Sequence, residues 1–102
     1  MIIINHKTKK VIFECEKETV REAILEAMKS DANLRGANLS NADLSGAGFY
    51  YANLRYANLS NADLSGADLT GISIEDTYFE KTKLIYKNKL MELTMKEIKE
   101  NS

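Results

Sequence analysis

Residues 32–71 read ANLRG ANLSN ADLSG AGFYY ANLRY ANLSN ADLSG ADLTG, which is eight consecutive groups of five. Alanine opens every group, and leucine or phenylalanine follows two residues later. The string ANLSNADLSGA occurs at residues 37–47 and again, unchanged, at 57–67. A helix needs apolar residues three and four apart and a half-buried strand two apart, so neither explains a period of five. Four sides of five residues that close into one coil of twenty, with the coils stacked, explain both repeats.

The alanine and the leucine or phenylalanine of each group are expected to point into the coil. The other three residues are expected to point outward. Side chains twenty residues apart then stack in columns, namely Leu34–Leu54–Ile74, Leu39–Leu59–Phe79, Leu44–Leu64–Leu84 and Phe49–Leu69. We expect all eleven of these side chains to be buried, in a close-packed interior rather than a pore.

The last position of each group is expected to form a corner of the coil. Gly or Asn stands there in six groups, and both residues tolerate the positive φ that the third residue of a type II turn requires. Tyr51 and Tyr56 break this rule. Because a bulky residue is disfavoured at positive φ, the sequence predicts a different turn type at these two corners.

These groups resemble the pentapeptide-repeat family, whose motif is A(D/N)LXX. Seven of the eight groups carry Ala, then Asn or Asp, then Leu, and only Ala47–Gly48–Phe49 departs from the motif. The resemblance implies an all-β solenoid, a right-handed, four-sided parallel β-helix. Known members include proteins that shield or inhibit type II topoisomerases by resembling DNA, and many members have no assigned role.

The repeat decays after residue 71 but keeps its phase, so that residues 32–86 make about three coils in one domain. Residues 1–31 are expected to cover the first coil, whose strand edges would otherwise be open. Alternating apolar residues predict a β-hairpin over Ile2–Cys15. The pattern Thr19-Val20-Arg21-Glu22 is a capping box, and it predicts a helix that ends near Lys29–Ser30.

Residues 87–102 are expected to form a C-terminal helix over Asn88–Glu100, with an apolar arc of about 200°. That arc is wider than one contact face needs, so we expect one side to cover the last coil and the other to join a second copy. The candidate dimer interface is Ile85, Tyr86, Leu90, Met91 and Leu93. The competing arrangement is a monomer in which the tail caps its own coil.

Composition narrows the classes of partner. A net charge of −1 gives no electrostatic argument for binding nucleic acid or a membrane surface. The single cysteine excludes an internal disulfide, and the apolar stretch Met1–Ile4 is far too short for a signal peptide or a membrane span. We therefore expect a cytoplasmic protein.

Catalytic and metal-binding patterns are not found. The serines occupy a repeat position, and the one histidine, His6, lies outside the repeats, so no nucleophile–base arrangement can be assembled. His6 is expected to be a solvated turn residue and Cys15 a small buried side chain. Asp43 and Asp63 are expected to stack as a solvated pair, since the other ligands of a cation are missing. The sequence predicts a protein that is not an enzyme and that holds no cofactor or metal.

One outward face combines arginine and tyrosine, which are enriched at interface hot spots. The face centred on Leu34, Leu54 and Ile74 carries a candidate interaction surface made of Arg35, Tyr50, Tyr51, Arg55, Tyr56 and Glu75. The alternative is that the tyrosines cover turn backbone and the charges are solvated.

The sequence favours a non-enzymatic protein-binding or structural module that self-associates as a homodimer and has an unidentified protein partner. The alternative is a DNA-mimicking regulator of a type II topoisomerase such as DNA gyrase. A DNA mimic should be covered with acidic side chains, whereas the repeats set Asp43, Asp63 and Asp68 against Arg35 and Arg55.

Overall fold

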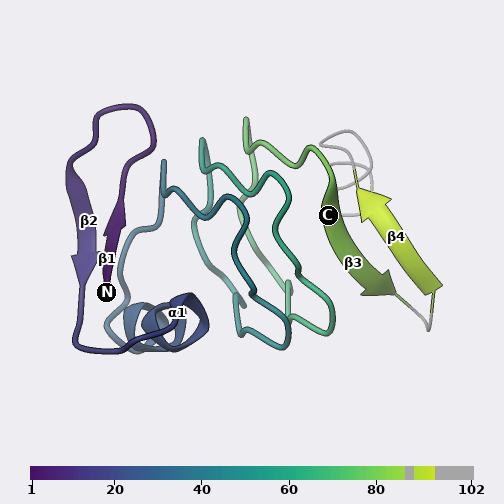
Figure 1. Cartoon of the computed structure of the whole chain (residues 1–102), viewed down its shortest axis with the longest axis horizontal. Coiled ribbons are helices and arrows are strands. Elements are labelled where there is room, and N and C mark those ends of the chain that lie inside the picture. Colours follow the sequence, from purple (N-terminus) through teal and green to yellow (C-terminus); the bar gives the residue numbers. More distant parts are fainter. Residues whose placement is uncertain (87–88, 94–102) are drawn as a thin grey trace.

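A computed structural model describes residues 1–86 and 89–93, with side chains described as far as residue 84. The regular elements are β1 (Ile2–Ile4), β2 (Val11–Glu14), α1 (Val20–Lys29), β3 (Thr82–Tyr86) and β4 (Lys89–Leu93). Figure 1 shows β1, β2 and α1 at one end of the molecule, the coils of the repeats in the middle, and β3 and β4 at the other end.

The backbone of the repeats returns to the same place every twenty residues. Parallel bridges join Asn38 to Asn58, Asp43 to Asp63, Gly48 to Asp68, Asn53 to Ser73, Asn58 to Tyr78 and Asp63 to Lys83. At each bridge the backbone bonds run both ways, as where Leu39 N–H donates to the Asn58 carbonyl at 2.8 Å and Asn58 N–H donates to the Ala37 carbonyl at 2.9 Å. The period of twenty is confirmed, and the repeats have a β-helix type of fold (Figure 1).

Every fifth residue from Asp31 to Lys81 has a positive φ, and each marks a corner of a coil. Tyr51 (φ 60°) and Tyr56 (φ 62°) share this conformation with the glycines, so the prediction of a different turn at these corners is wrong. The reason is the coil that follows. The Tyr51 N–H donates to the Thr70 carbonyl at 2.7 Å and the Tyr56 N–H to the Glu75 carbonyl at 3.0 Å, and these bonds fix the corner despite the local strain.

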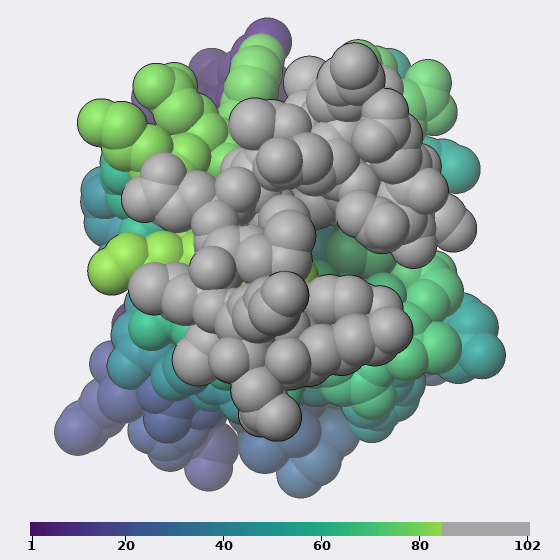
Figure 2. Space-filling view, turned by 90° about the vertical axis from the view of Figure 1, so that its right-hand side faces the viewer, coloured from purple at the N-terminus to yellow at the C-terminus, as the bar shows by residue number. Residues whose placement is uncertain are grey.

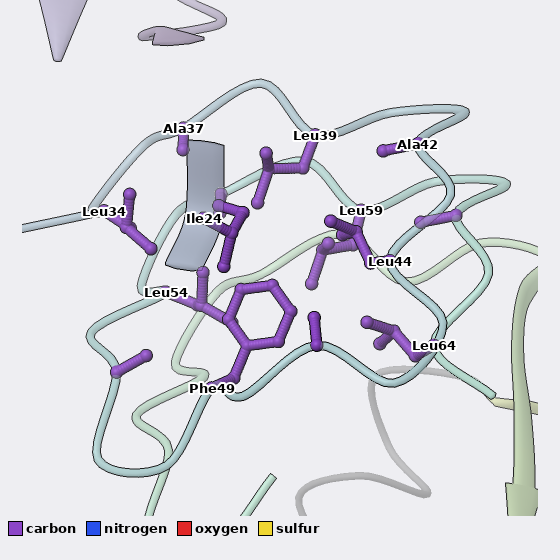
Figure 3. Packing of buried hydrophobic residues seen from close by; sticks show 14 of the residues in the cluster. Ile24, Leu34, Ala37, Leu39, Ala42, Leu44, Phe49, Leu54, Leu59 and Leu64 are labelled. Atoms are coloured by element: carbon purple, nitrogen blue, oxygen red, sulfur yellow. The ribbon is translucent and has the colours of Figure 1, made fainter. Parts of the chain in front are cut away.

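The interior is filled by the columns of large side chains. Nine of the eleven predicted residues are buried, whereas Leu69 and Leu84, which end their columns, are only half-buried. Figure 3 shows Leu34, Leu44, Phe49 and their neighbours pointing into the coil from all sides. Thr77 and Thr82 stand where earlier repeats have alanine; both are fully buried, and their hydroxyls donate to the carbonyls of Leu54 (2.5 Å) and Leu59 (2.8 Å).

The predicted hairpin and helix are confirmed at the N-terminal end. Strand β1 pairs with β2 on one side and with the first coil on the other, where the Asn38 N–H donates to the Ile4 carbonyl at 2.8 Å. Helix α1 buries Ala23, Ile24 and Ala27, and Figure 3 shows Ile24 inside the outline of the coil. Cys15, expected to be buried, is half-buried against the same core.

The capping box predicted for α1 is formed by Thr19 and Glu22. The Thr19 hydroxyl accepts the Glu22 N–H at 3.1 Å and donates to the Glu22 carboxylate at 2.9 Å, so this carboxylate holds the Thr19 side chain.

Within the described residues, no helix has the length and hydropathy that crossing a membrane requires.

The C-terminal helix predicted over Asn88–Glu100 is wrong for residues 89–93, which form strand β4; its other residues lie outside the described part of the chain. Strand β4 pairs antiparallel with β3, from Thr82 opposite Leu93 to Tyr86 opposite Lys89. Because β3 bonds through Lys83 to the preceding coil, β4 satisfies the backbone groups of its other edge. Figure 2 views the molecule from this end, with the hairpin of β1 and β2 and helix α1 behind the repeats.

Candidate functional site

The tip of the β1–β2 hairpin lies along one corner of the β-helix, the one formed by residues 36, 56 and 76. The His6 N–H donates to the Gly36 carbonyl at 2.9 Å, and its Nε2 lies 2.7 Å from the Tyr56 carbonyl. Because a carbonyl can only accept, Nε2 carries the hydrogen. The imidazole also meets the Tyr78 ring edge to face, with 5.5 Å between centroids. His6 lies in the turn of the hairpin, as predicted, but it is half-buried and bonds to successive coils instead of being fully solvated.

Asn5 holds this tip in shape. Its side-chain Oδ1 accepts the backbone N–H groups of Lys7 (2.8 Å) and Thr8 (3.0 Å), and its backbone pairs with Lys10 and Lys9. Glycine suits position 36, because φ there is 75° and a Cβ would collide with the Asn5 amide. The tip is therefore a fixed part of the surface.

Two cations lie over two tyrosine rings at this corner. The Arg35 guanidinium is 4.5 Å from the centroid of the Tyr56 ring, and the Lys7 ammonium is 5.8 Å from that of Tyr78. The tyrosines are 40% and 42% exposed, so both rings remain open to a partner. Beside them lies a shallow depression of about 210 Å³, which is lined by Asn5, His6, Lys7, Thr8, Arg35, Gly36 and Tyr56. We call this depression and the Tyr78 ring the hairpin-tip site.

The predicted interaction surface is divided between two corners. Arg55 lies next to Glu75, with 4.0 Å between Nε and Oε2, in the predicted column. Tyr51 belongs to the neighbouring corner, where its ring occupies the space that a side chain at Gly71 would need. Tyr50 lies in the same way against Gly48. The structure thus brings Arg35 to Tyr56 and Arg55 to Glu75, and it places Tyr50 and Tyr51 apart from the hairpin-tip site.

Sequence reasoning missed Asn5, His6, Lys7, Thr8 and Tyr78. A signal existed for Tyr78, because it lies twenty residues after Asn58 and therefore next to the corner of Tyr56. The hairpin tip gave no such signal, since its position on the β-helix depends on how the hairpin docks.

Asp43 and Asp63 stack on successive coils as expected, and Asp43 is exposed, but it also pairs with an arginine of α1. Arg21 of α1 donates to the Asp43 carboxylate at 2.8 Å, and Asp63 lies one coil further on. Hydrogen bonds from the Ser45 hydroxyl and N–H, with Arg21, hold the pKa of Asp43 below its ordinary value of 3.8. Hydrogen bonds from Ser65 and Thr70 lower the pKa values of Asp63 and Asp68 in the same way. The described residues contain no group of three or more His, Cys, Asp or Glu that could hold a metal ion.

The predicted dimer residues Ile85, Tyr86, Leu90, Met91 and Leu93 lie on the strands of the β3–β4 hairpin, where Ile85 is opposite Leu90. Their side chains lie outside the described part of the structure, so the predicted interface stays a prediction.

Comparison with protein families agrees with the repeat pattern. Residues 30–66 match the family described as pentapeptide repeats, in eight copies. No similar protein was found among the curated proteins or among the solved structures. Residues 30–66 of this chain are therefore similar to the pentapeptide-repeat family.

Proposed function

We propose that the chain is a non-enzymatic module that binds a protein partner through the hairpin-tip site. In this proposal the repeats form a right-handed, four-sided solenoid of about three coils, which carries the site. A cytoplasmic location belongs to the same proposal.

One observation carries the proposal: Tyr56 and Tyr78 expose their rings beside the basic side chains of Arg35 and Lys7. Tyrosine and arginine are enriched among the residues that contribute most to binding at protein interfaces. The site is built on a corner of the β-helix and on a tip fixed by Asn5 and His6, so little conformational entropy is lost on binding.

Affinity capture from source cells tests this proposal with a Tyr56→Asn variant. Asn occupies equivalent corners at residues 41 and 61 with positive φ, so the variant keeps the fold and loses the ring. We expect a captured partner to be lost with Tyr56→Asn and retained with the control Lys81→Asn, the same kind of exchange at another corner. A partner retained equally by both variants would place the binding surface elsewhere.

The absence of catalysis is also part of the proposal. His6 bonds to the Tyr56 carbonyl through Nε2, and no hydrogen bond within the described part of the chain joins its ring to a serine, threonine or cysteine. A histidine that acts as general base needs its nucleophile within hydrogen-bond reach.

We further propose a homodimer joined at the C-terminal end. Among the described residues, strand β4 is the outer strand of a two-stranded sheet, and such an edge offers N–H and C=O groups to another chain. Two copies of the β3–β4 hairpin related by a two-fold axis would satisfy both edges. Sedimentation equilibrium should give twice the chain mass of 11.5 kDa, and Leu90→Asp with Leu93→Asp should reduce it to the monomer. A mass near 11.5 kDa for the wild-type chain at tens of micromolar would exclude the dimer.

DNA mimicry ranks second as a function. The acidic column of the repeats consists of Asp43 and Asp63. Arg21 pairs with Asp43 at one end, and Lys83 follows Asp63 at the other, so positive charge interrupts the row of negative charge at both ends. A DNA mimic needs an uncompensated row. We expect DNA gyrase supercoiling to be neither inhibited nor protected at micromolar protein, and a dose-dependent effect would reverse this ranking.

A further inference from the structure

We propose that the hairpin-tip site binds the carboxylate side chain of an acidic segment in a protein partner. This inference rests on the proposed function and adds the chemistry of the partner. It follows from the charge, size and rigidity of the depression.

The cations of this site have no internal partner among the described residues. Arg21 lies 2.8 Å from Asp43 and Arg55 lies 4.0 Å from Glu75, whereas Arg35 and Lys7 form no such ion pair in the described part of the chain. Asp76 stands at the same corner, two coils beyond Gly36, and it forms no ion pair with either of them. Two adjacent cations without a carboxylate favour an anionic group from outside.

The position of Arg35 suits a carboxylate. Its guanidinium lies over the face of Tyr56, at 4.5 Å from the ring centroid. A guanidinium packed on an aromatic ring keeps the N–H groups of its edge available, and these match the two oxygens of a carboxylate. Lys7, which lies over Tyr78, supplies a second positive charge from the hairpin tip.

The size of the depression selects the kind of ligand. Its volume of about 210 Å³ is below the roughly 300–1,000 Å³ typical of sites that enclose small molecules. It accommodates the end of one side chain, while the exposed rings of Tyr56 and Tyr78 offer contact area for the rest of a bound segment. This combination favours a peptide over a free metabolite.

The test is an NMR titration of the full chain, labelled with ¹⁵N, with a blocked octaglutamate peptide at low salt. We expect shifts at the amides of Lys7, Thr8, Arg35, Gly36 and Tyr56, and no shifts with octaglutamine. Raising NaCl from about 50 to about 300 mM should weaken binding several-fold, because the attraction is screened.

Variants separate this site from general electrostatic attraction. Arg35→Gln should lower the affinity about tenfold and Lys7→Gln about threefold. Arg55→Gln removes the same charge from the equivalent position one coil further on, where Glu75 already pairs with it, and should change the affinity less than about twofold. Unchanged shifts for the ladder amides of Leu39 and Leu59 would show that each variant is folded.

Three results would overturn the inference. The first is equal loss of affinity in Arg35→Gln and Arg55→Gln, and the second is absence of binding. The third is inorganic phosphate shifting the same amides with the affinity of the peptide or better, which would make this a site for small anions. If a partner is still captured through Tyr56 while octaglutamate does not bind, the proposed function stands and the acidic partner is wrong.

Discussion

The corner residue of each repeat carries the strain of this fold. Positive φ recurs at residues 31, 36, 41 and so on to 81, and only four of these positions hold glycine. Asn and Asp adopt this conformation at low cost, whereas a bulky side chain such as that of Tyr or Lys does so at roughly 1–2 kcal/mol. The chain tolerates Tyr51 and Tyr56 there because the next coil supplies the carbonyls that accept their backbone N–H groups.

Two glycine substitutions separate backbone strain from collision. Gly46 has a φ of 71°, and no atom lies within 4 Å of the position that a Cβ would take. Gly46→Ala should therefore cost about 1 kcal/mol in free energy of unfolding from backbone conformation alone. Gly36→Ala adds a collision with Asn5 and should cost clearly more. Urea unfolding measures both, and Gly66→Ala, at a glycine with the same φ of 71° and only an ordinary contact at 3.9 Å, is the control that should match Gly46→Ala. Equal costs at Gly36 and Gly46 would contradict the docking of the hairpin tip.

The aspartates of the repeat should make stability depend on acid pH. Asp43, Asp63 and Asp68 have pKa values below the ordinary 3.8 in the folded chain, mainly because Ser45, Ser65 and Thr70 donate to them. As pH falls, the unfolded chain takes up these protons first. Their contribution is therefore present above about pH 4 and is lost as pH falls through the lower, folded pKa values.

Asparagine at these three positions removes the titration and keeps the hydrogen bond. Asn33, Asn38, Asn53 and Asn58 already accept the N–H two residues on, at 2.9–3.2 Å. The difference in free energy of unfolding between about pH 7 and about pH 2 should be smaller in the triple Asp→Asn variant. The same fall in both proteins would show that other groups control acid unfolding.

The hairpin and α1 could be predicted because local patterns specify them: alternating apolar residues for one, and the Thr19–Glu22 cap for the other. The strand at residues 89–93 could not be predicted, because the spacing of Leu90, Met91 and Leu93 also fits a helix with a broad apolar arc. Pairing with β3, which no local pattern reveals, decides their conformation. In the hairpin-tip site, the period of twenty brings Arg35 next to Tyr56, but no local pattern places His6 there.

Helix α1 covers the first coil chiefly through Ile24, which is fully buried. Ile24→Ala should lower the free energy of unfolding by about 2–5 kcal/mol, since it leaves a cavity between the helix and the coil. Leu25 is 51% exposed on the same helix, so Leu25→Ala should cost less than about 1 kcal/mol. Chemical denaturation compares the two, and similar costs would contradict the packing of α1 on the repeats.

Stacking makes the whole molecule a set of columns, and the position within a column sets the cost of a substitution. Leu64 is 1% exposed between Leu44 and Leu84, whereas Leu84 is half-buried at the end of that column. Leu64→Ala should cost about 2–5 kcal/mol and Leu84→Ala markedly less. Thermal or urea unfolding can rank the two, and a larger cost at Leu84 would mean that the column order is wrong.

The hydrogen bonds between coils are the feature on which the fold, the corners and the hairpin-tip site all depend. Scalar couplings across hydrogen bonds, measured by NMR on the labelled chain, detect each donor and acceptor directly. We expect couplings from the Leu39 amide to the Asn58 carbonyl, from Leu44 to Asp63 and from Leu64 to Lys83, at bonds of 2.8–2.9 Å. Couplings from these amides to carbonyls three or four residues away in the sequence would contradict the β-helix. Couplings to carbonyls of the next coil other than those named would contradict its register.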